Sequence, residues 1–378
     1  MKLSKIRIIG AMSVTAVWAV LAAWCWFGGD NAFSMAERRN LAQKPALTWD
    51  TVMDGSFMEK FDDYSLDQFP LRDSFRQIKS LTHYYALQQK DNHDIYIAQG
   101  YAAKQEYPLR TDSVERAASR FSLIYRLLIK GNTDKIYMAV VPDKGYYLAA
   151  DAGQLSMDYS QLMATMETAM PWATHIDITG SLSAESYYRT DTHWRQETLT
   201  DAANVICQAM GVTAADASSY TVETLERPFY GVYYGQAALP MQGETMYLLH
   251  SEVLDGCTTY VGDWDVKTNT PVYRKLYDGV YDRQRLEGED MYETYLSGIQ
   301  SLLRIENPNA ATDRELIVFR DSFGSSMVPL LLQDYAVVTV IDIREIDAMT
   351  LRNFNINWNA DVLFLFSTLV LNNSETIK

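Results

Sequence analysis

The sequence has few of the residues that build metal centres and disulfide frameworks. Its 378 residues include 3 cysteines, at positions 25, 207 and 257, and 5 histidines. No cysteine pair has CxxC spacing, and no HExxH, P-loop or GxGxxG motif occurs. We therefore predict no catalytic metal, no bound nucleotide and no other cofactor. Two alternatives stay open for Cys207 and Cys257, a single disulfide or two free buried thiols.

Positive charge is also scarce. The chain has 33 Lys and Arg against 48 Asp and Glu, which gives a formal net charge of −15. A field of that sign repels polyanions, so we expect no nucleic-acid partner. A hydrophobic share of 48% with 12% aromatic residues is typical of a globular protein. A chain of this length can bury one large α/β core or two smaller ones.

One long apolar run lies near the N-terminus. Lys2, Lys5 and Arg7 precede residues 8–29, IIGAMSVTAVWAVLAAWCWFGG, which carry no charge. A helix of this length spans the hydrocarbon core of a bilayer. The run is longer than a signal-peptide core and ends in bulky aromatic residues, so we favour an uncleaved transmembrane anchor over a cleaved signal. The preceding cations favour a cytoplasmic N-terminus, which places the rest of the chain outside the cytoplasm as a single-pass protein of the cell membrane.

The sequence suggests three parts. Residues 1–30 form the cytoplasmic tip and anchor, and residues 31–80 form a juxtamembrane helical stalk that Pro70 interrupts. We read the stalk helices as packing against the main domain. Residues 81–378 form that domain. In it, short apolar strands alternate with helices, a pattern typical of a parallel sheet covered on both faces.

We therefore predict a three-layer α/β/α fold with a parallel sheet. Residues 212–310 break the alternation, because they are rich in Tyr, Gly, Thr and acidic residues. We expect them to form an irregular, β-rich insertion or lid between the two halves of the domain.

A serine follows one of the predicted strands directly. Glu315 to Phe319 form the strand, and Arg320-Asp321-Ser322-Phe323-Gly324 leads into a helix. This strand-to-helix turn places Ser322 at the carboxyl edge of the sheet, where open α/β folds bind ligands. The free N–H groups at the start of the helix can stabilise an oxyanion. The alternative is that Asp321 and Ser322 only cap the helix.

A serine nucleophile needs a base, and the segment YYRTDTHW offers His193. Two histidines come two residues after an aspartate, His93 in a polar loop and His193 in this aromatic segment. In an extended segment, residues i and i+2 point to the same side, so Asp191 can accept a hydrogen bond from one imidazole nitrogen. The other nitrogen would then face the serine. Alternatively, Asp191 or Thr192 caps the following helix and His193 is a first-turn residue.

Together the two motifs resemble the DHHW family of exported bacterial proteins. That family is related to the SGNH-type periplasmic O-acetyltransferases of alginate biosynthesis, which carry a DTHW form of the motif. The resemblance extends to FDDYSLDQFPLRDSF, VPDKGYY and YETYLSGIQSLLRIENPNA, so it covers residues 37 to the C-terminus. It implies an SGNH-like fold with Ser322 as nucleophile, His193 as general base and Asp191 as the orienting residue.

The resemblance also implies a reaction and partners. We expect a serine O-acyltransferase that acetylates a cell-surface polysaccharide and receives acyl groups from a membrane-bound O-acyltransferase. A carbohydrate O-acetyl esterase and a non-catalytic glycan-binding or assembly protein are the alternatives. The chain departs from the family by having Thr192 before His193 and Arg320 where glycine is common. Arg320 can narrow the turn or bind a substrate anion.

Four further residues are weaker candidates for substrate binding. Tyr188, Arg189 and Trp194 flank the Asp-His pair, where they can contact a sugar ring, although Trp194 can equally be core packing. Arg344 follows the next strand and can face the same sheet edge or lie in a solvated loop.

Overall fold

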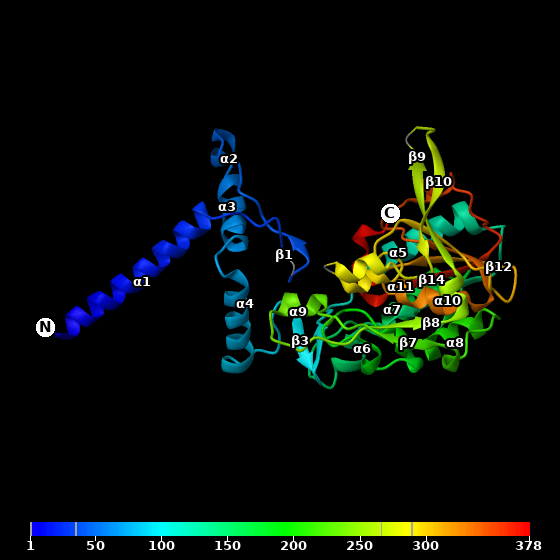
Figure 1. The fold of residues 1–378 in the computed structure, drawn as a ribbon, viewed down its shortest axis with the longest axis horizontal. Helices are drawn as coiled ribbons and strands as arrows, with labels where there is room; N and C mark the ends of the chain where they lie inside the picture. Colours follow the sequence, from blue (N-terminus) through cyan, green and yellow to red (C-terminus); the bar gives the residue numbers. More distant parts are fainter. Residues whose placement is uncertain (1, 35, 266, 289) are drawn as a thin grey trace. The chain divides into compact units, whose positions relative to one another are not determined.

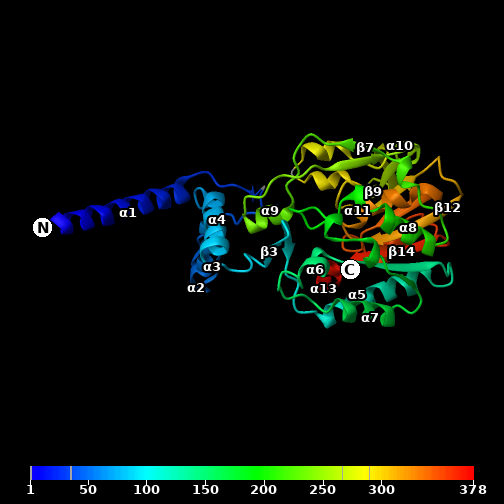
Figure 2. The same ribbon diagram turned by 90° about the horizontal axis from the view of Figure 1, so that it is seen from below.

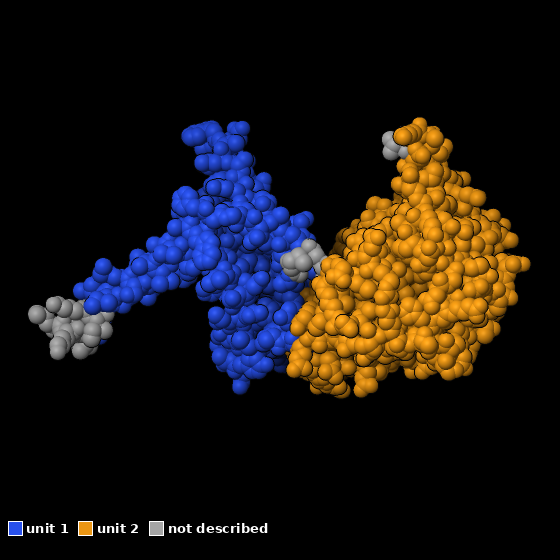
Figure 3. Space-filling view, in the orientation of Figure 1, with its two compact units in different colours: residues 1–93, 234–241 blue, residues 94–233, 242–378 orange. Residues whose placement is uncertain are grey.

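The computed structural model describes residues 2–34, 36–265, 267–288 and 290–378. The chain divides into two compact units (Figure 3). Unit 1 comprises residues 1–93 and 234–241, and unit 2 comprises residues 94–233 and 242–378. The division predicted at residues 30 and 80 is finer than these units and stays a prediction.

Unit 1 is mainly helical. It begins with the apolar helix α1 (Lys2–Phe27), in which Arg7–Phe27 has a mean hydropathy of 2.0 and is long enough to cross a membrane. Pro70 lies between two later helices and prevents one continuous helix. The remaining elements are β1 (Phe33–Ser34), β2 (Arg39–Asn40), α2 (Trp49–Met53), α3 (Ser56–Asp67), α4 (Arg72–Leu81) and a π-helical turn at Thr82–Ala86.

Unit 2 is built on an eight-stranded sheet in the order β10-β9-β11-β13-β12-β14-β5-β6. The five strands from β13 to β6 run parallel, and the other three pair antiparallel. The strands are β5 (Ile136–Val141), β6 (Thr174–Ile176), β9 (Thr258–Asp265), β10 (Thr270–Asp278), β11 (Leu302–Glu306), β12 (Arg314–Arg320), β13 (Tyr335–Ile341) and β14 (Asp361–Ser367).

Helices cover both faces of this sheet. Alternate residues of β12 enter different cores: Leu316 and Val318 pack in one, Ile317 and Phe319 in the other. The first core also contains α8 (Thr200–Ala209) and the 3-10 helix Val328–Asp334; the second contains α5 (Thr111–Ile124) and α7 (Tyr159–Ala169). Figures 1 and 2 show α5 and α7 together on one face. The predicted three-layer α/β class with its parallel sheet and N-terminal apolar helix is confirmed.

The region 212–310 is more regular than we expected. It supplies β9, β10 and β11, which extend the sheet, and the separate antiparallel pair β7 (Thr221–Thr224) and β8 (Tyr247–His250). Its Thr, Tyr and Val residues suit half-buried strands. Strands β9 and β10 pair as a hairpin, whereas β11 pairs with β9 and with β13. The short elements are β3 (Ile95–Ala98), β4 (Tyr101–Lys104), α6 (Lys144–Leu148), α9 (Val232–Ala237), α10 (Glu252–Gly256), α11 (Gly324–Met327), α12 (Ala348–Leu351) and α13 (Thr368–Asn372).

The two cysteines of unit 2 are free and buried in the structure, so they do not form a disulfide. Burial raises the pKa of the Cys207 thiol and of the Cys257 thiol to about 12. Both thiols are therefore protonated at neutral pH and act as small apolar side chains.

Candidate active site

Ser322 lies in the turn between β12 and α11, at the carboxyl edge of the parallel strands. It is partly exposed, while its neighbours Asp321 and Phe323 are buried. The Asp321 carboxylate accepts hydrogen bonds from the Phe323 N–H at 3.0 Å and from the Ser367 N–H and hydroxyl at 2.7 and 2.6 Å. Asp321 thus holds the turn against the end of β14.

The DTHW segment forms a tight hairpin rather than the start of a helix. Tyr187 and Trp194 pair as an antiparallel bridge, and the Tyr188 N–H donates to the His193 carbonyl at 3.1 Å. This reversal brings the Asp191 and His193 side chains to the same side of the segment.

Three side chains meet in one line of hydrogen bonds. His193 Nδ1 lies 2.6 Å from Asp191 Oδ1, and His193 Nε2 lies 2.7 Å from Ser322 Oγ. Because an ionised carboxylate only accepts hydrogen bonds, Nδ1 carries the proton and Nε2 accepts from the serine hydroxyl. The structure therefore brings together the three residues on which the sequence argument depended.

Asp191 is fully buried and its oxygens have several donors. Its Oδ1 also accepts from the His193 N–H at 3.0 Å, and its Oδ2 accepts from the Val232 N–H at 2.8 Å. The preceding Gly231 is packed so closely that a Cβ there would lie 2.2 Å from the Asp191 Cβ. Only glycine allows this approach of the two backbones.

Glu244 anchors the hairpin through its backbone at Arg189 and Thr190. It accepts hydrogen bonds from the N–H groups of Arg189 and Thr190 at 2.6 and 2.8 Å, and from the Thr190 hydroxyl at 2.7 Å. The Thr190 hydroxyl oxygen in turn accepts from the Gly231 N–H at 3.0 Å. Nothing in the sequence singled out Glu244, because it lies in an irregular segment distant from the motif.

Lys144 supports the same hairpin from within the protein. Its side chain is buried, and Nζ donates to the carbonyls of Tyr188, at 2.9 Å, and Ala102. Burial lowers the pKa of Lys144 to about 7, although Asp191 and Glu244 favour its charged form. Lys144 belongs to the VPDKGYY segment, which the sequence singled out only as a family resemblance.

Tyr292 packs against the imidazole of His193. The two rings are stacked, with centroids 3.9 Å apart and planes 9° from parallel. The Tyr292 hydroxyl lies 2.8 Å from Ser326 Oγ, which fixes the phenol ring. Burial raises the pKa of Tyr292 far enough that the phenol is neutral at physiological pH. The stacking restricts rotation of the imidazole about its side-chain bonds.

The weaker candidates that flank the Asp-His pair lie in different environments. Tyr188 and Trp194 are fully buried, and the Trp194 Nε1–H donates to the Phe323 carbonyl at 2.9 Å. Arg189 is exposed, with its guanidinium 5.6 Å from the centroid of the Tyr101 ring. Of these three, only Arg189 presents its side chain to solvent.

Arg320 and Arg344 share one buried acid. The Arg320 guanidinium is fully buried, 3.7 Å from Asp342 Oδ2, and donates to the Gly298 carbonyl at 3.0 Å. Arg344 is bidentate on Asp342, at 2.9 and 2.6 Å. Arg320 therefore has no surface on which a substrate can bind in this structure. Among the described residues, no group of three or more His, Cys, Asp and Glu is placed to hold a metal.

Comparison with known proteins supports the motif argument. Residues 174–341 match the family model for DHHW proteins. The resemblance to the DHHW family is confirmed. The matched range contains the hairpin, Ser322 and Tyr292. No curated protein matches the sequence.

Solved structures show the same fold. A DHHW family protein from Eubacterium siraeum is 22% identical with a TM-score of 0.60, over 75% of this chain and 93% of that chain. Bacillus cereus PatB1 with a sulfonyl adduct is 19% identical with a TM-score of 0.55, over 73% of this chain and 95% of that chain. At these identities the similarity establishes the fold alone.

Proposed function

We propose that this chain is a serine O-acyltransferase that acts outside the cytoplasm. The observation that carries the proposal is the line of hydrogen bonds from Asp191 through His193 to Ser322, with separations of 2.6 and 2.7 Å, at the carboxyl edge of the sheet. An aspartate, a histidine and a partly exposed serine in this order are the elements of nucleophilic acyl transfer.

The first half-reaction forms an acyl-enzyme. Ser322 Oγ attacks the carbonyl carbon of an acyl donor while His193 Nε2 accepts the hydroxyl proton. Asp191 stabilises the imidazolium, and the Ser322 backbone N–H would stabilise the oxyanion. The tetrahedral intermediate collapses as His193 returns the proton to the leaving group, which leaves Ser322 as an ester.

The second half-reaction transfers the acyl group. His193 removes the proton of an acceptor hydroxyl, which attacks the ester carbonyl, and Ser322 leaves with the proton from His193. The acceptor we propose is a hydroxyl of a cell-surface polysaccharide, and the acyl group is acetyl, as the family resemblance implies. Water in place of the sugar would make the same site a carbohydrate esterase.

The proposed location determines the donor. Helix α1 would anchor the chain in the cell membrane as a single span, with unit 2 outside the cytoplasm. Acyl-CoA is a cytoplasmic metabolite, so a membrane-bound O-acyltransferase would have to carry acyl groups across the membrane. Ser322 would receive the acyl group from that partner.

A serine-directed fluorophosphonate tests the nucleophile. We expect the full-length protein to be labelled at Ser322 and to turn over an activated acetyl ester. Ser322→Ala should lose both, whereas Ser219→Ala, at an exposed serine remote in sequence, should lose neither. Absence of labelling at Ser322 in the folded protein would favour a non-catalytic glycan-binding protein and refute the proposal.

A second measurement separates transfer from hydrolysis. Acetyl groups from the activated ester are followed into an added oligosaccharide and into free acetate. Transfer to the oligosaccharide in excess of release supports the acyltransferase, and release alone supports the esterase.

A further inference from the structure

Helix α4 of unit 1 turns two arginines and a serine toward the rest of the unit and exposes its apolar residues. The side chains of Arg72 and Arg76 are 17% and 19% exposed, and Ser80 is fully buried. The apolar stripe comprises four residues with large exposed fractions: Leu71 at 59%, Phe75 at 43%, Ile78 at 59% and Tyr85 at 76%. Steps of four and three residues place Leu71, the N-cap residue, with Phe75 and Ile78 on one side of α4, and Tyr85 lies in the π-helical turn that follows the helix. An amphipathic helix in a water-soluble unit has the opposite arrangement.

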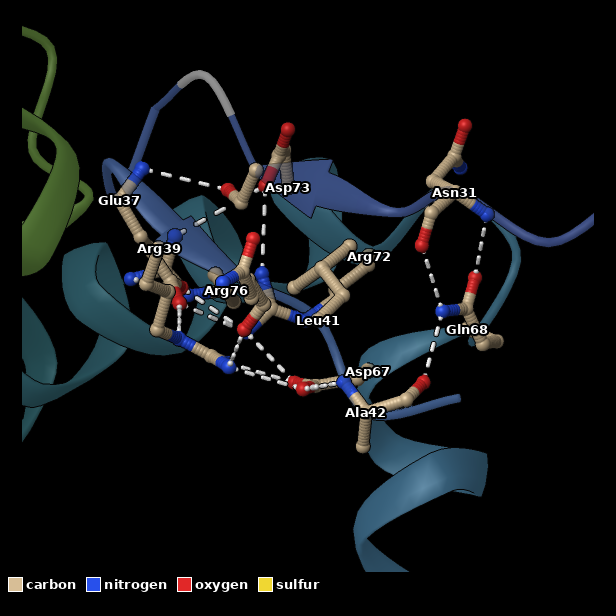
Figure 4. Close-up of polar contacts among 12 residues, drawn as sticks. Asn31, Glu37, Arg39, Leu41, Ala42, Asp67, Gln68, Arg72, Asp73 and Arg76 are labelled. Carbon is tan, nitrogen blue, oxygen red and sulfur yellow. Dashed lines mark hydrogen bonds and ion pairs between the residues drawn. The ribbon is translucent and has the colours of Figure 1, made fainter. Parts of the chain in front are cut away.

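Ion pairs fix this orientation. Figure 4 shows Arg72 and Arg76 pointing toward Glu37, and their guanidinium nitrogens lie 2.9 and 2.7 Å from its Oε1. Arg76 also donates to the Gly235 carbonyl at 2.9 Å, and the Ser80 hydroxyl donates to the Ala237 carbonyl at 2.5 Å. Rolling α4 to bury its apolar stripe would break these contacts and leave Arg39 as the remaining cation on the Glu37 carboxylate.

The apolar helix α1 lies in the same unit and indicates what covers the stripe. The Trp18 ring is 6.3 Å from the Phe69 ring, and the Trp26 ring is 6.4 Å from the Phe61 ring. Trp18 lies nine positions before Phe27, the end of the apolar span, which corresponds to about 14 Å of helix. Phe69 is two residues before Leu71, so the first residue of the apolar stripe lies beside the span rather than beyond it.

We propose that the apolar stripe of α4 is inserted into the lipid bilayer beside α1. The polar face of α4 then remains on the rest of unit 1 through Arg72 and Arg76, and its apolar face contacts acyl chains, as the apolar faces of membrane-bound amphipathic helices do. Tyr85 suits the interface because its ring is apolar and its hydroxyl is polar. The inference rests on the membrane anchoring by α1 that we proposed above, and it gives unit 1 a second attachment to the same membrane.

Spin labelling in nanodiscs tests this insertion. All three native cysteines are buried, so Ile78→Cys introduces an exposed thiol that can be labelled selectively. The matched control is Asp73→Cys on the same helix, because the Asp73 side chain is 65% exposed outside the stripe. The full-length variants are reconstituted in phosphatidylcholine nanodiscs, and collisions of the nitroxide with oxygen and with a water-soluble nickel chelate are measured.

We expect the ratio of oxygen to nickel accessibility to be several-fold higher at position 78 than at position 73. High nickel accessibility at position 78 would leave the stripe in water, and protection from both reagents would place protein over it, from a second copy or another part of the chain. Either result overturns the proposal. Phe75→Cys repeats the measurement in case one label perturbs the helix.

A label on α1 shows whether a negative result means that α4 is not inserted or that α1 does not span the membrane. Val17 is 58% exposed, and Val17→Cys should report lipid if α1 spans the bilayer. Lipid contact at position 17 without lipid contact at position 78 would refute insertion of α4 and leave the anchor intact. None of these readouts depends on acyl transfer.

Discussion

Replacing Lys144 should change how the stability of the protein depends on pH. Burial lowers the pKa of this lysine from 10.5 to about 7 in the folded chain. Between these two values the unfolded chain binds a proton that the folded chain does not, so stability rises with pH across this window. Below about pH 7 the penalty for burying the lysine is complete, and above about pH 10.5 it is absent.

The size of the effect follows from the pKa difference. One pKa unit corresponds to about 1.4 kcal/mol, so the penalty should shrink by about 2 kcal/mol between pH 7 and pH 9. Lys144→Met has no charge to bury, but it leaves the buried Tyr188 and Ala102 carbonyls without their donor, at a cost of about 1–3 kcal/mol each. The loss of these hydrogen bonds should lower the free energy of unfolding of the variant by the same amount at every pH. The wild type alone should show the additional pH dependence that comes from Lys144.

Urea unfolding of both proteins at several pH values measures this difference. The free energy of unfolding of the wild type minus that of Lys144→Met should increase by about 2 kcal/mol from pH 7 to pH 9. Subtracting the variant removes the contribution of all other titrating groups. A difference that stays constant across this range would show that Lys144 has the same charge in the folded and unfolded chains, and would refute the reasoning.

Two further substitutions test the supports of the proposed catalytic residues. Gly231→Ala would place a methyl group 2.2 Å from the Asp191 Cβ, so the backbone must shift and activated-ester turnover should fall by about tenfold or more. Gly180→Ala, where a Cβ meets nothing within 4 Å, is its control and should keep full turnover. Tyr292→Leu removes the ring stacked on His193 and should lower turnover about two- to tenfold, whereas Tyr292→Phe keeps the ring and most of the activity. Equal losses in the Leu and Phe variants would mean that the hydroxyl contact with Ser326, rather than stacking, is what matters.

Sequence reasoning reached furthest where the relevant contacts are local. Asp191 and His193 are two residues apart and Ser322 directly follows an apolar strand, so strand geometry and turn position made them candidates beside the alternative of helix caps. The family resemblance, rather than spacing, joined His193 to Ser322, which lies 129 residues away in the sequence. The supports of the site come from distant segments. Lys144, Glu244 and Tyr292 reach the hairpin only after the sheet has assembled, and no spacing in the sequence relates them to it.

The same limit explains two differences in the fold. Strand β11 of region 212–310 pairs with β9 and β13, which are distant in the sequence, so the composition indicated β structure without the strand order. In the stalk, the apolar residues recur at mixed spacings, so the sequence does not say which side of a helix faces inward. Arg72 and Arg76 decide this in the structure through Glu37, which lies outside the helix.

Arg320 departs from the family pattern, yet it does not narrow the turn that carries Ser322. A bulky cation beside Asp321 and Ser322 would narrow the turn if it pointed toward the sheet edge. Its guanidinium instead faces Asp342 and the Gly298 carbonyl, and burial, which lowers the pKa of Arg320, is opposed by the charge of Asp342. Gly324 makes this possible, since a Cβ there would lie 2.6 Å from the Arg320 Cβ. The contact with Gly298 also ties Arg320 to the segment that carries Tyr292. Arg320 thus points away from the sheet edge and, through Gly298, supports the segment whose Tyr292 stacks on the proposed base, His193.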